Sequence, residues 1–589
     1  MSSSPTFKLA PSILSSDFAR LALLALLVIG TTITPAWAER ARQTPPANPE
    51  ADLVLLNGKI ITVDPQDTIA QAVAVRDGKI LKVGNDDDVK AFIGRQTNVL
   101  DLRGRTVTPG LVDSHNHVMY YGRQFWEGFL DIRFPKARSK ADLLRLVAER
   151  AQATPEGEWI SGNQGFSLSL QETPNRWELD SVAPANPVYL RHMSGQYAVV
   201  NSYALKLAAI NKDTPNPYGG VIGRHPITKE PTGFLFHYPA ENLVGQIATG
   251  YGVRTDDELM DDVERGQDLC LAAGYTSAQD VIVSSPRHVG TYLKVAQNGL
   301  RMRVYLMEYV SSEEAARRLL RIVEPFKTEM LAFGGWKLAL DGGPAARTSL
   351  MYDRSLPAAQ RSYEYHDQET LNRIVSMLHK EGFQVAFHAG GDKAIDMAIN
   401  AIEAALEETP RSNHRHRIEH LLFPTRQALE RIKRLGIVVS LQPQWISFHG
   451  DGFRSLTDEK TMERLMPIRT MMEMGIPIAF GSDVPATIML EPKWAFIGAV
   501  TRSANSGYVA APQERISIKD ALRMHTIGSA YASFEEDTKG SIEEGKLADV
   551  VVWSHDLYSA PIGRLRDLEA EVTIVGGKIV FTSANVSGR

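Results

Sequence analysis

The central part of this 589-residue chain alternates short apolar runs with amphipathic helical stretches. The runs predict eight short strands, at residues 107–112, 276–281, 303–306, 336–340, 384–387, 417–420, 437–441 and 478–480. Helical patterns over 368–380, 393–408 and 425–435 separate several of them, and a fourth pattern over 458–474 is interrupted by Pro467. Eight parallel strands with intervening helices form a (β/α)8 barrel, so the pattern predicts an α/β fold of the TIM-barrel type.

The two ends of the globular region share a different pattern. Short β-type runs lie between residues 53 and 83, with Asn57-Gly58 and Asp77-Gly78 between them, dipeptides that type I′ hairpin turns favour. Similar short β-type runs occur near the C-terminus, at 549–553, 572–575 and 578–581. Because isolated hairpins are marginal in water, we expect both ends to pair into one small β-sandwich.

These patterns predict the domain boundaries. We expect the β-sandwich to combine residues 51–106 and 541–589, with the barrel over 107–510 and terminal barrel helices over 511–540. A long insertion at about 120–270 separates the first and second barrel strands. Since loops that follow barrel strands emerge at the C-terminal face, the insertion should lie over the barrel mouth.

The N-terminus has the layout of a secretory signal peptide over residues 1–38. An apolar run over 21–29 follows Arg20, and Ala36-Trp37-Ala38 supplies a small-residue cleavage site. This predicts a periplasmic or secreted protein with no stable membrane insertion after cleavage; an uncleaved N-terminal anchor is the alternative. Residues 8–21 resemble the opening strand of ribulose-phosphate 3-epimerases, and a misplaced start codon would instead predict a cytoplasmic protein. Residues 39–50 read as a polar, Pro-rich linker.

Composition narrows the chemistry. The chain has 64 Lys and Arg against 69 Asp and Glu, a net charge of −5, which argues against a general nucleic-acid binder. The single cysteine, Cys270, excludes an intramolecular disulfide and any multi-cysteine metal site. Fifteen histidines remain as the candidates for chemistry.

Five side chains follow barrel strands at their C-terminal ends, where active sites of this fold are built. His115 and His117 end the first strand, and side chains two apart on a strand project to one face. His388, His420 and Asp483 close the fifth, sixth and eighth strands. The sequence therefore predicts a divalent metal site of one or two ions, with zinc first among the ions that imidazole and carboxylate ligands suit.

The runs that contain these residues resemble the amidohydrolase superfamily. They are residues 107–117, 387–392, 417–420 and 481–485, and 539–549 is also typical of the family. The likeness covers about residues 51–582. Within the superfamily, the chain resembles the YtcJ-like branch, which includes N-substituted formamide deformylases. It implies that Lys337, in the fourth strand, is carboxylated by CO₂ and bridges two metals. The alternative is an ordinary ammonium paired with Asp341 and a mononuclear site.

The resemblance implies a metal-dependent hydrolase that cleaves a non-peptide carbon–nitrogen bond, of amide or N-formyl type, in a small molecule. His115, His117 and Asp483 would hold one metal, and His388 and His420 a second, with Asp483 as the proton shuttle. A lactonase, esterase or isomerase of the same superfamily is one alternative. A non-catalytic regulatory or binding protein on the same scaffold is another.

Candidate substrate contacts lie in the loops around the predicted mouth. They are His192 and Gln196 in the insertion, Arg347 after the fourth strand, and Trp445 and His449 after the seventh. Relatives commonly carry His where this chain has Gln196, and often Glu where it has His237, so an altered pocket is expected. The resemblance is also compatible with a homo-oligomer.

Overall fold

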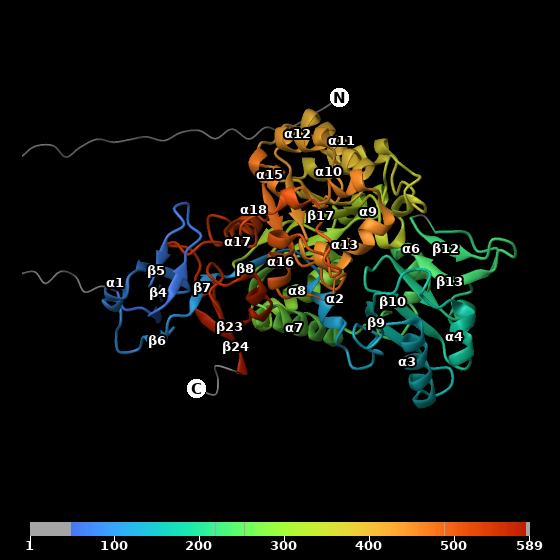
Figure 1. Ribbon diagram of the computed structural model, residues 1–589, viewed down its shortest axis with the longest axis horizontal. Coiled ribbons are helices and arrows are strands. Elements are labelled where there is room, and N and C mark those ends of the chain that lie inside the picture. The colour runs from blue at the N-terminus through green and yellow to red at the C-terminus, as the bar shows by residue number, and fades with distance from the viewer. Residues whose placement is uncertain (1–48, 218, 253, 488, 585–589) are drawn as a thin grey trace, which may run out of the picture. The chain divides into compact units, whose positions relative to one another are not determined.

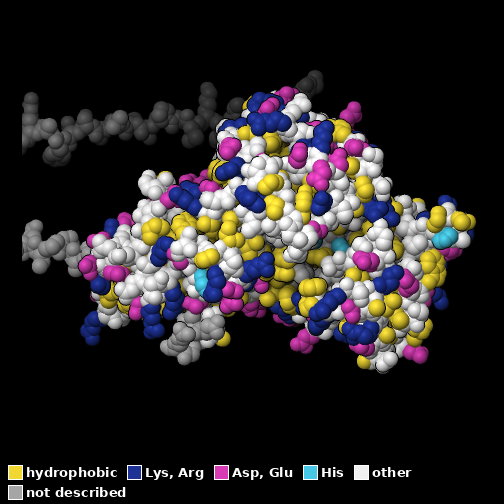
Figure 2. Space-filling view, in the orientation of Figure 1, with side chains coloured by type: hydrophobic (Ala, Val, Ile, Leu, Met, Phe, Trp, Pro, Cys, Tyr) yellow, Lys and Arg dark blue, Asp and Glu magenta, His cyan; other side chains and the backbone are white. Residues whose placement is uncertain are grey.

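The computed structural model describes residues 49–584 except 218, 253 and 488 (Figure 1). The predicted signal peptide and nearly all of the predicted linker lie outside the described residues. Among the helices in the described part of the chain, none combines the length and apolar character needed to cross a membrane. On the face shown in Figure 2, basic and acidic side chains are interspersed.

Eight parallel strands form the centre of the molecule, in the order in which they occur along the chain. The first strand, β8, and the last, β21, also lie side by side, since the Asp483 amide donates to the His115 carbonyl at 2.7 Å. Nearly all residues of these strands are buried, because both faces of a closed parallel sheet are covered. The predicted (β/α)8 fold is therefore confirmed. The strands are β8 (Leu111–Asn116), β14 (Tyr275–Val283), β15 (Arg303–Tyr309), β17 (Leu331–Ala339), β18 (Gln384–Ala389), β19 (Arg417–His420), β20 (Val438–Leu441) and β21 (Ile478–Phe480).

Amphipathic helices cover the outside of the barrel. In α10, the residues Leu371, Ile374, Val375 and Leu378 are buried at helical spacing, as the sequence pattern predicts. The stretch over 458–474 is two helices with Pro467 directly before the second. The helices that alternate with the strands include α7 (Asp256–Ala272), α8 (Pro286–Gly299), α9 (Glu313–Leu319), α10 (Gln368–Lys380), α11 (Asp392–Glu408), α12 (Arg426–Leu435), α14 (Glu459–Met462), α15 (Ile468–Met474) and α17 (Ile518–Met524).

A small β domain joins the two ends of the described chain, and Figure 1 shows its blue N-terminal strands beside red C-terminal ones. One sheet has the order β5–β4–β1–β6 and the other β24–β23–β22–β7–β2–β3. Residues from both ends share one apolar core, for example Leu55, Val552 and Ile574. The strands are β1 (Leu53–Leu56), β2 (Lys59–Ile61), β3 (Ile69–Ala70), β4 (Ala72–Arg76), β5 (Lys79–Gly84), β6 (Asn98–Asp101), β7 (Thr106–Pro109), β22 (Val550–Trp553), β23 (Ala570–Val575) and β24 (Lys578–Thr582).

The run over 107–112, predicted as one barrel strand, belongs to two different sheets. Strand β7 pairs antiparallel with β22 in the small domain, and the barrel begins only at Leu111 in β8. Gly110 lies between them, where a Cβ would collide with the Thr276 side chain. Both strands are buried, so the apolar pattern continues from one to the other. The boundary between the two sheets could therefore not be predicted from this pattern.

The insertion after the first barrel strand forms a sheet of its own, in the order β12–β13–β11–β10–β9. It follows α2 (Val118–Arg123), which packs against α7, and it has separate apolar cores. Its strands are β9 (Ile160–Phe166), β10 (Val188–His192), β11 (Tyr197–Val200), β12 (Val221–Arg224) and β13 (Pro231–Phe236), and its helices are α3 (Lys140–Ala153), α4 (Arg176–Val182), α5 (Ser202–Leu207) and α6 (His237–Gly245).

Candidate metal centre

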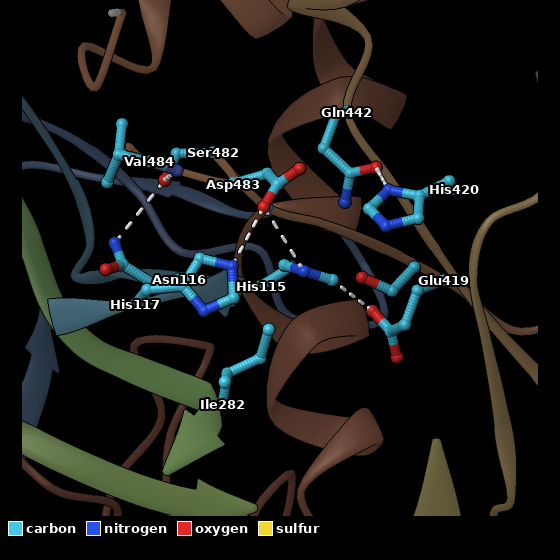
Figure 3. Close-up of polar contacts among 12 residues, drawn as sticks. His115, Asn116, His117, Ile282, Glu419, His420, Gln442, Ser482, Asp483 and Val484 are labelled. Atoms are coloured by element: carbon cyan, nitrogen blue, oxygen red, sulfur yellow. Dashed lines mark hydrogen bonds and ion pairs between the residues drawn. The ribbon is translucent and has the colours of Figure 1, made fainter. Parts of the chain in front are cut away.

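Closure of the barrel brings the end of β8 against the turn that follows β21. The Asp483 Oδ1 atom lies 3.3 Å from Nε2 of His115 and 3.1 Å from Nε2 of His117 (Figure 3). All three side chains are buried, and their ligand atoms lie within 4.8 Å of one another. Residues that are 366 positions apart in the chain thus form one compact donor set.

The other two predicted histidines extend this set. The ring centroid of His420 lies 4.8 Å from that of His115 and 4.4 Å from that of His388. His117 adds to the same row, with its ring 5.4 Å from His115. All four rings, together with Asp483, line one cavity. The structure thus brings together every histidine predicted from strand ends.

Lys337 lines the same cavity from β17. It is 2% exposed, and among the described residues its Nζ atom has no hydrogen-bond partner. Burial lowers the pKa of Lys337 to about 8, against the opposing charges of Glu419 and Asp483. The alternative pairing with Asp341 is wrong, because that carboxylate accepts from His388 and from the amides of Gly390 and Gly391.

Three of the four histidines are held through Nδ1 by an acceptor from the end of another barrel strand. The pairs are His115 with Glu419 (2.5 Å), His420 with Gln442 (2.7 Å) and His388 with Asp341 (3.1 Å). Each ring is thereby oriented while its Nε2 atom stays available. This is the arrangement of metal-ligating histidines, whose second nitrogen is fixed by a carboxylate or amide. Together with Asp483 and the unpartnered Lys337 nitrogen, the donor set fits a divalent cation.

The carboxylates are ionised despite their burial. Burial opposes ionisation of Asp483, but the charge and hydrogen bond of His115 and the hydrogen bond of His117 hold its pKa well below the usual range. Burial likewise opposes ionisation of Glu419, yet Arg417, Lys337 and His115 hold its pKa well below the usual range. The charge of Glu419 is balanced by the buried Arg417, and the negative charge of Asp483 beside His115 and His117 favours a cation there.

Sequence reasoning missed the three acceptors Glu419, Gln442 and Asp341. Glu419 directly precedes His420, and side chains of successive strand residues normally point to opposite faces. Here His420 has φ of 74°, a left-handed conformation in which the His420 ring lines the cavity while the Glu419 carboxylate reaches His115. Asp483 shares this feature, with φ of 56°. The alternating pattern of the sequence contains no sign of such a turn.

The cavity above the cluster has a volume of about 720 Å³. Of the predicted substrate contacts, Gln196, Trp445 and His449 line it. The Trp445 ring stacks on His420 at 5.0 Å with an interplanar angle of 11°. Burial lowers the pKa of His449 to about 4, so this ring is neutral at pH 7.

Two predicted substrate contacts are corrected by the structure, because neither lines the cavity. The His192 ring stacks on Tyr197 at 4.4 Å in the insertion core, and its Nδ1 bonds the Ser194 hydroxyl at 2.7 Å. Arg347 turns outward and donates to the Gln360 side chain at 3.0 Å. Sequence position placed both residues near the mouth, but local packing directs their side chains away from it.

A (β/α)8 barrel with histidines, an aspartate and a lysine gathered at its C-terminal rim defines a metal-dependent hydrolase. The chain belongs to the amidohydrolase family, whose family model matches residues 98–581. The resemblance predicted from the sequence is confirmed.

Individual relatives are similar over nearly their full length. Protein LONG AFTER FAR-RED 3 of Arabidopsis thaliana is 31% identical over 570 residues, covering 92% of this chain and 94% of the relative. The N-substituted formamide deformylase of Arthrobacter pascens is 29% identical over 542 residues, covering 90% and 98%. The crystal structure of a metal-dependent hydrolase from Pyrococcus horikoshii OT3 superposes with a TM-score of 0.69 at 24% identity, covering 87% and 99%, which supports the fold.

Proposed function

We propose that this protein hydrolyses a non-peptide carbon–nitrogen bond, of amide or N-formyl type, in a small molecule. The observation that carries the proposal is the Asp483 carboxylate, ionised and within 3.3 Å of two imidazoles in a cavity large enough for a substrate. The similarity to an N-substituted formamide deformylase, which extends over 98% of that enzyme, favours the amide class over other bonds.

Zinc is the divalent ion we propose first, since imidazole and carboxylate ligands suit it; iron, manganese and nickel would accept the same donors. His115, His117 and Asp483 would hold one ion, and His388 and His420 a second. Such an ion supplies Lewis acidity that makes water nucleophilic near neutral pH and polarises a carbonyl. The remaining roles, such as proton transfer, are proposed for side chains of the protein itself.

Asp483 is the proposed proton shuttle. Its carboxylate accepts the proton that the attacking water loses and returns it to the departing nitrogen, because an amine anion is too basic to leave unprotonated. Its Oδ1 atom lies 3.3 Å from Nε2 of His115 and 3.1 Å from Nε2 of His117, the two histidines that would hold the same ion, so the carboxylate is positioned at the rim.

Lys337 is proposed to carry CO₂ as a carbamate. Its unprotonated Nζ atom attacks the carbon of CO₂, a nitrogen–carbon bond forms as one carbon–oxygen π bond opens onto oxygen, and one proton passes from the nitrogen to water. The lowered pKa of about 8 makes the free amine accessible, and the nitrogen has no partner that would compete within the described chain. The carbamate would place two further oxygen donors between the two groups of histidines.

The proposed substrate carries an apolar or aromatic group. Aromatic rings line much of the cavity, from both the barrel and the insertion, and such rings recognise flat apolar groups. They belong to Tyr120, Tyr238, Tyr309, Trp445 and Phe453.

The test is a screen of zinc-loaded protein against N-alkylformamides, N-acyl amines, lactones and esters, with amine or acid release as the readout. We expect amides to turn over and Asp483→Asn to lower kcat by at least about 100-fold while most of the metal stays bound. In ¹³C-bicarbonate buffer, a carbamate resonance should be present in the wild type and absent in Lys337→Ala.

Other outcomes would contradict the proposal in distinct ways. Turnover of lactones or esters alone would assign the chain to another reaction of the family. Wild-type rates in Asp483→Asn would remove the proton shuttle. Protein that binds no metal and hydrolyses nothing would favour the non-catalytic alternative.

A further inference from the structure

Three histidines that line the cavity, His237, His366 and His449, are not among the proposed metal ligands. His237 is the first residue of α6, and its backbone has φ of 64°, which is unusual for a residue other than glycine. It is 3% exposed and lines the cavity beside the metal cluster. A residue kept in a sparsely populated conformation inside a pocket points to a functional constraint at that position.

The two nitrogens of the His237 ring have different environments. Nδ1 lies 2.5 Å from the Tyr365 hydroxyl and 3.2 Å from the Gln196 side-chain oxygen. Nε2 is buried and has no hydrogen-bond partner within the described part of the chain. In the tautomer that leaves Nε2 protonated, the Tyr365 hydroxyl, which is a stronger acid than an imidazole N–H, is the donor to Nδ1. An N–H group in such a place requires an acceptor from outside the protein.

The position of the ring places this N–H close to the reacting groups. A Cβ atom added at Gly342 would lie 2.6 Å from Cε1 of His237, so the ring packs directly against the backbone after β17. Gly342 follows Asp341, the residue that holds His388. Burial and, second, the nearby His388 lower the pKa of His237 to about 3, which supports a neutral ring that donates without transferring a proton.

We propose that His237 is a further catalytic residue, which donates a hydrogen bond from Nε2 to the oxygen of the substrate acyl group. The inference rests on the proposed hydrolysis of an amide or N-formyl bond. As water adds to the carbonyl carbon, negative charge grows on this oxygen, and a fixed donor aimed at it stabilises the transition state more than the substrate. The hydrogen bond from Tyr365 to Nδ1 keeps the ring in place while this happens.

Two substitutions at position 237 distinguish the effect of a hydrogen-bond donor at Nε2 from the effect of any polar side chain. His237→Asn keeps a residue that tolerates positive φ and places its amide near Nδ1, so it lacks a donor at the position of Nε2. His237→Gln extends its amide to that position and restores a donor. His225→Gln, on the β12–β13 connection outside the cavity, is the matched control.

For the wild type and the three variants, kcat and KM are measured with N-butylformamide, or with the best amide of the screen, together with zinc content. We expect His237→Asn to lower kcat by about 100-fold with little change in KM and full zinc content. His237→Gln should recover at least about tenfold of that loss, and the control should match the wild type. A kcat for His237→Asn within threefold of the wild type would overturn the inference.

Binding of sodium formate to the zinc-loaded proteins, measured by calorimetry, separates the two proposals because it needs no turnover. We expect a Kd about tenfold weaker in His237→Asn than in the wild type, and close to the wild type in His237→Gln. Equal formate affinity in all variants would overturn the inference even if amides are hydrolysed. If the wild type hydrolyses no amide, the proposed function fails. The formate affinities of the wild type and the His237 variants then decide whether His237 donates a hydrogen bond to a bound oxygen.

Discussion

At the scale of single residues, the candidate centre depends on Glu419 as much as on the histidines. Its Oε2 atom accepts from His115 at 2.5 Å, and its Oε1 atom accepts from Arg417 at 2.5 Å. Glu419 and Arg417 are both fully buried, so neither charge is compensated by water. Glu419 therefore orients one proposed ligand and balances one buried cation at the same time.

We predict that Glu419→Gln weakens zinc binding by about 10- to 100-fold, because a neutral amide holds the His115 ring less firmly and makes it a weaker base. Competition against a chelator of known affinity measures the effect. Glu430→Gln, in an exposed ion pair of α12, should leave the zinc affinity unchanged. Equal affinity in Glu419→Gln and the control would show that this carboxylate does not support the centre.

The sequence predicted the residues whose position alone determines their role. His115, His117, His388, His420 and Asp483 follow strand ends, and closure of the barrel brings strand ends together. Their acceptors depend on local backbone turns, such as the positive φ at His420, that no periodic pattern contains. The same reason explains why His192 failed as a substrate contact, since its place near the mouth says nothing of its stacking on Tyr197.

At the scale of elements, glycines in α2 and α7 allow the two helices to pack closely beside β8, the first strand that carries predicted metal ligands. A Cβ at Gly266 of α7 would overlap the carbonyl oxygen of Val118 in α2, and one at Gly122 would overlap that of Asp262. The two helices therefore touch through their backbones. Since α2 begins directly after His117, this close contact helps to fix the end of β8.

We predict that Gly266→Ala destabilises the protein by about 1–3 kcal/mol, because the added methyl group forces the two helices apart. Gly290→Ala is the matched control, since Gly290 also lies inside a helix but a Cβ there meets nothing within 4 Å. The control should stabilise by about 0.5–1 kcal/mol through the better helix propensity of alanine. Urea unfolding of both variants measures the difference, and equal stabilities would refute the role of the backbone contact.

The elements themselves followed from hydrophobic periodicity in most places. Seven of the eight barrel strands were predicted at positions that overlap the observed ones, whereas the first was predicted at 107–112 and lies at Leu111–Asn116. The insertion was predicted at about 120–270, but its five-stranded sheet was not. Its pairing joins segments such as β9 and β10 across α4, and periodicity does not specify which strands become neighbours.

At the scale of the whole described molecule, a buried ion pair connects the barrel to the small β domain. Arg303, at the start of β15, donates through Nε and Nη2 to the Asp549 carboxylate at 2.7 and 2.9 Å. Asp549 directly precedes β22 and also accepts from the Gly576 amide at 2.8 Å. The pair lies at the N-terminal end of the strand, the opposite end from the metal centre.

We predict that Asp549→Ala destabilises the protein by about 3–5 kcal/mol, since it leaves the buried Arg303 guanidinium without its main counter-charge. Asp567→Ala, which breaks the exposed pair with Arg564, should cost less than about 1 kcal/mol. Urea unfolding gives both values, and kcat of each folded variant should equal that of the wild type because neither carboxylate reaches the cavity. If Asp549→Ala unfolds at the same urea concentration as Asp567→Ala, the connection does not stabilise the fold. If Asp549→Ala instead lowers kcat without a change in the free energy of unfolding, the small domain influences the metal centre through β15.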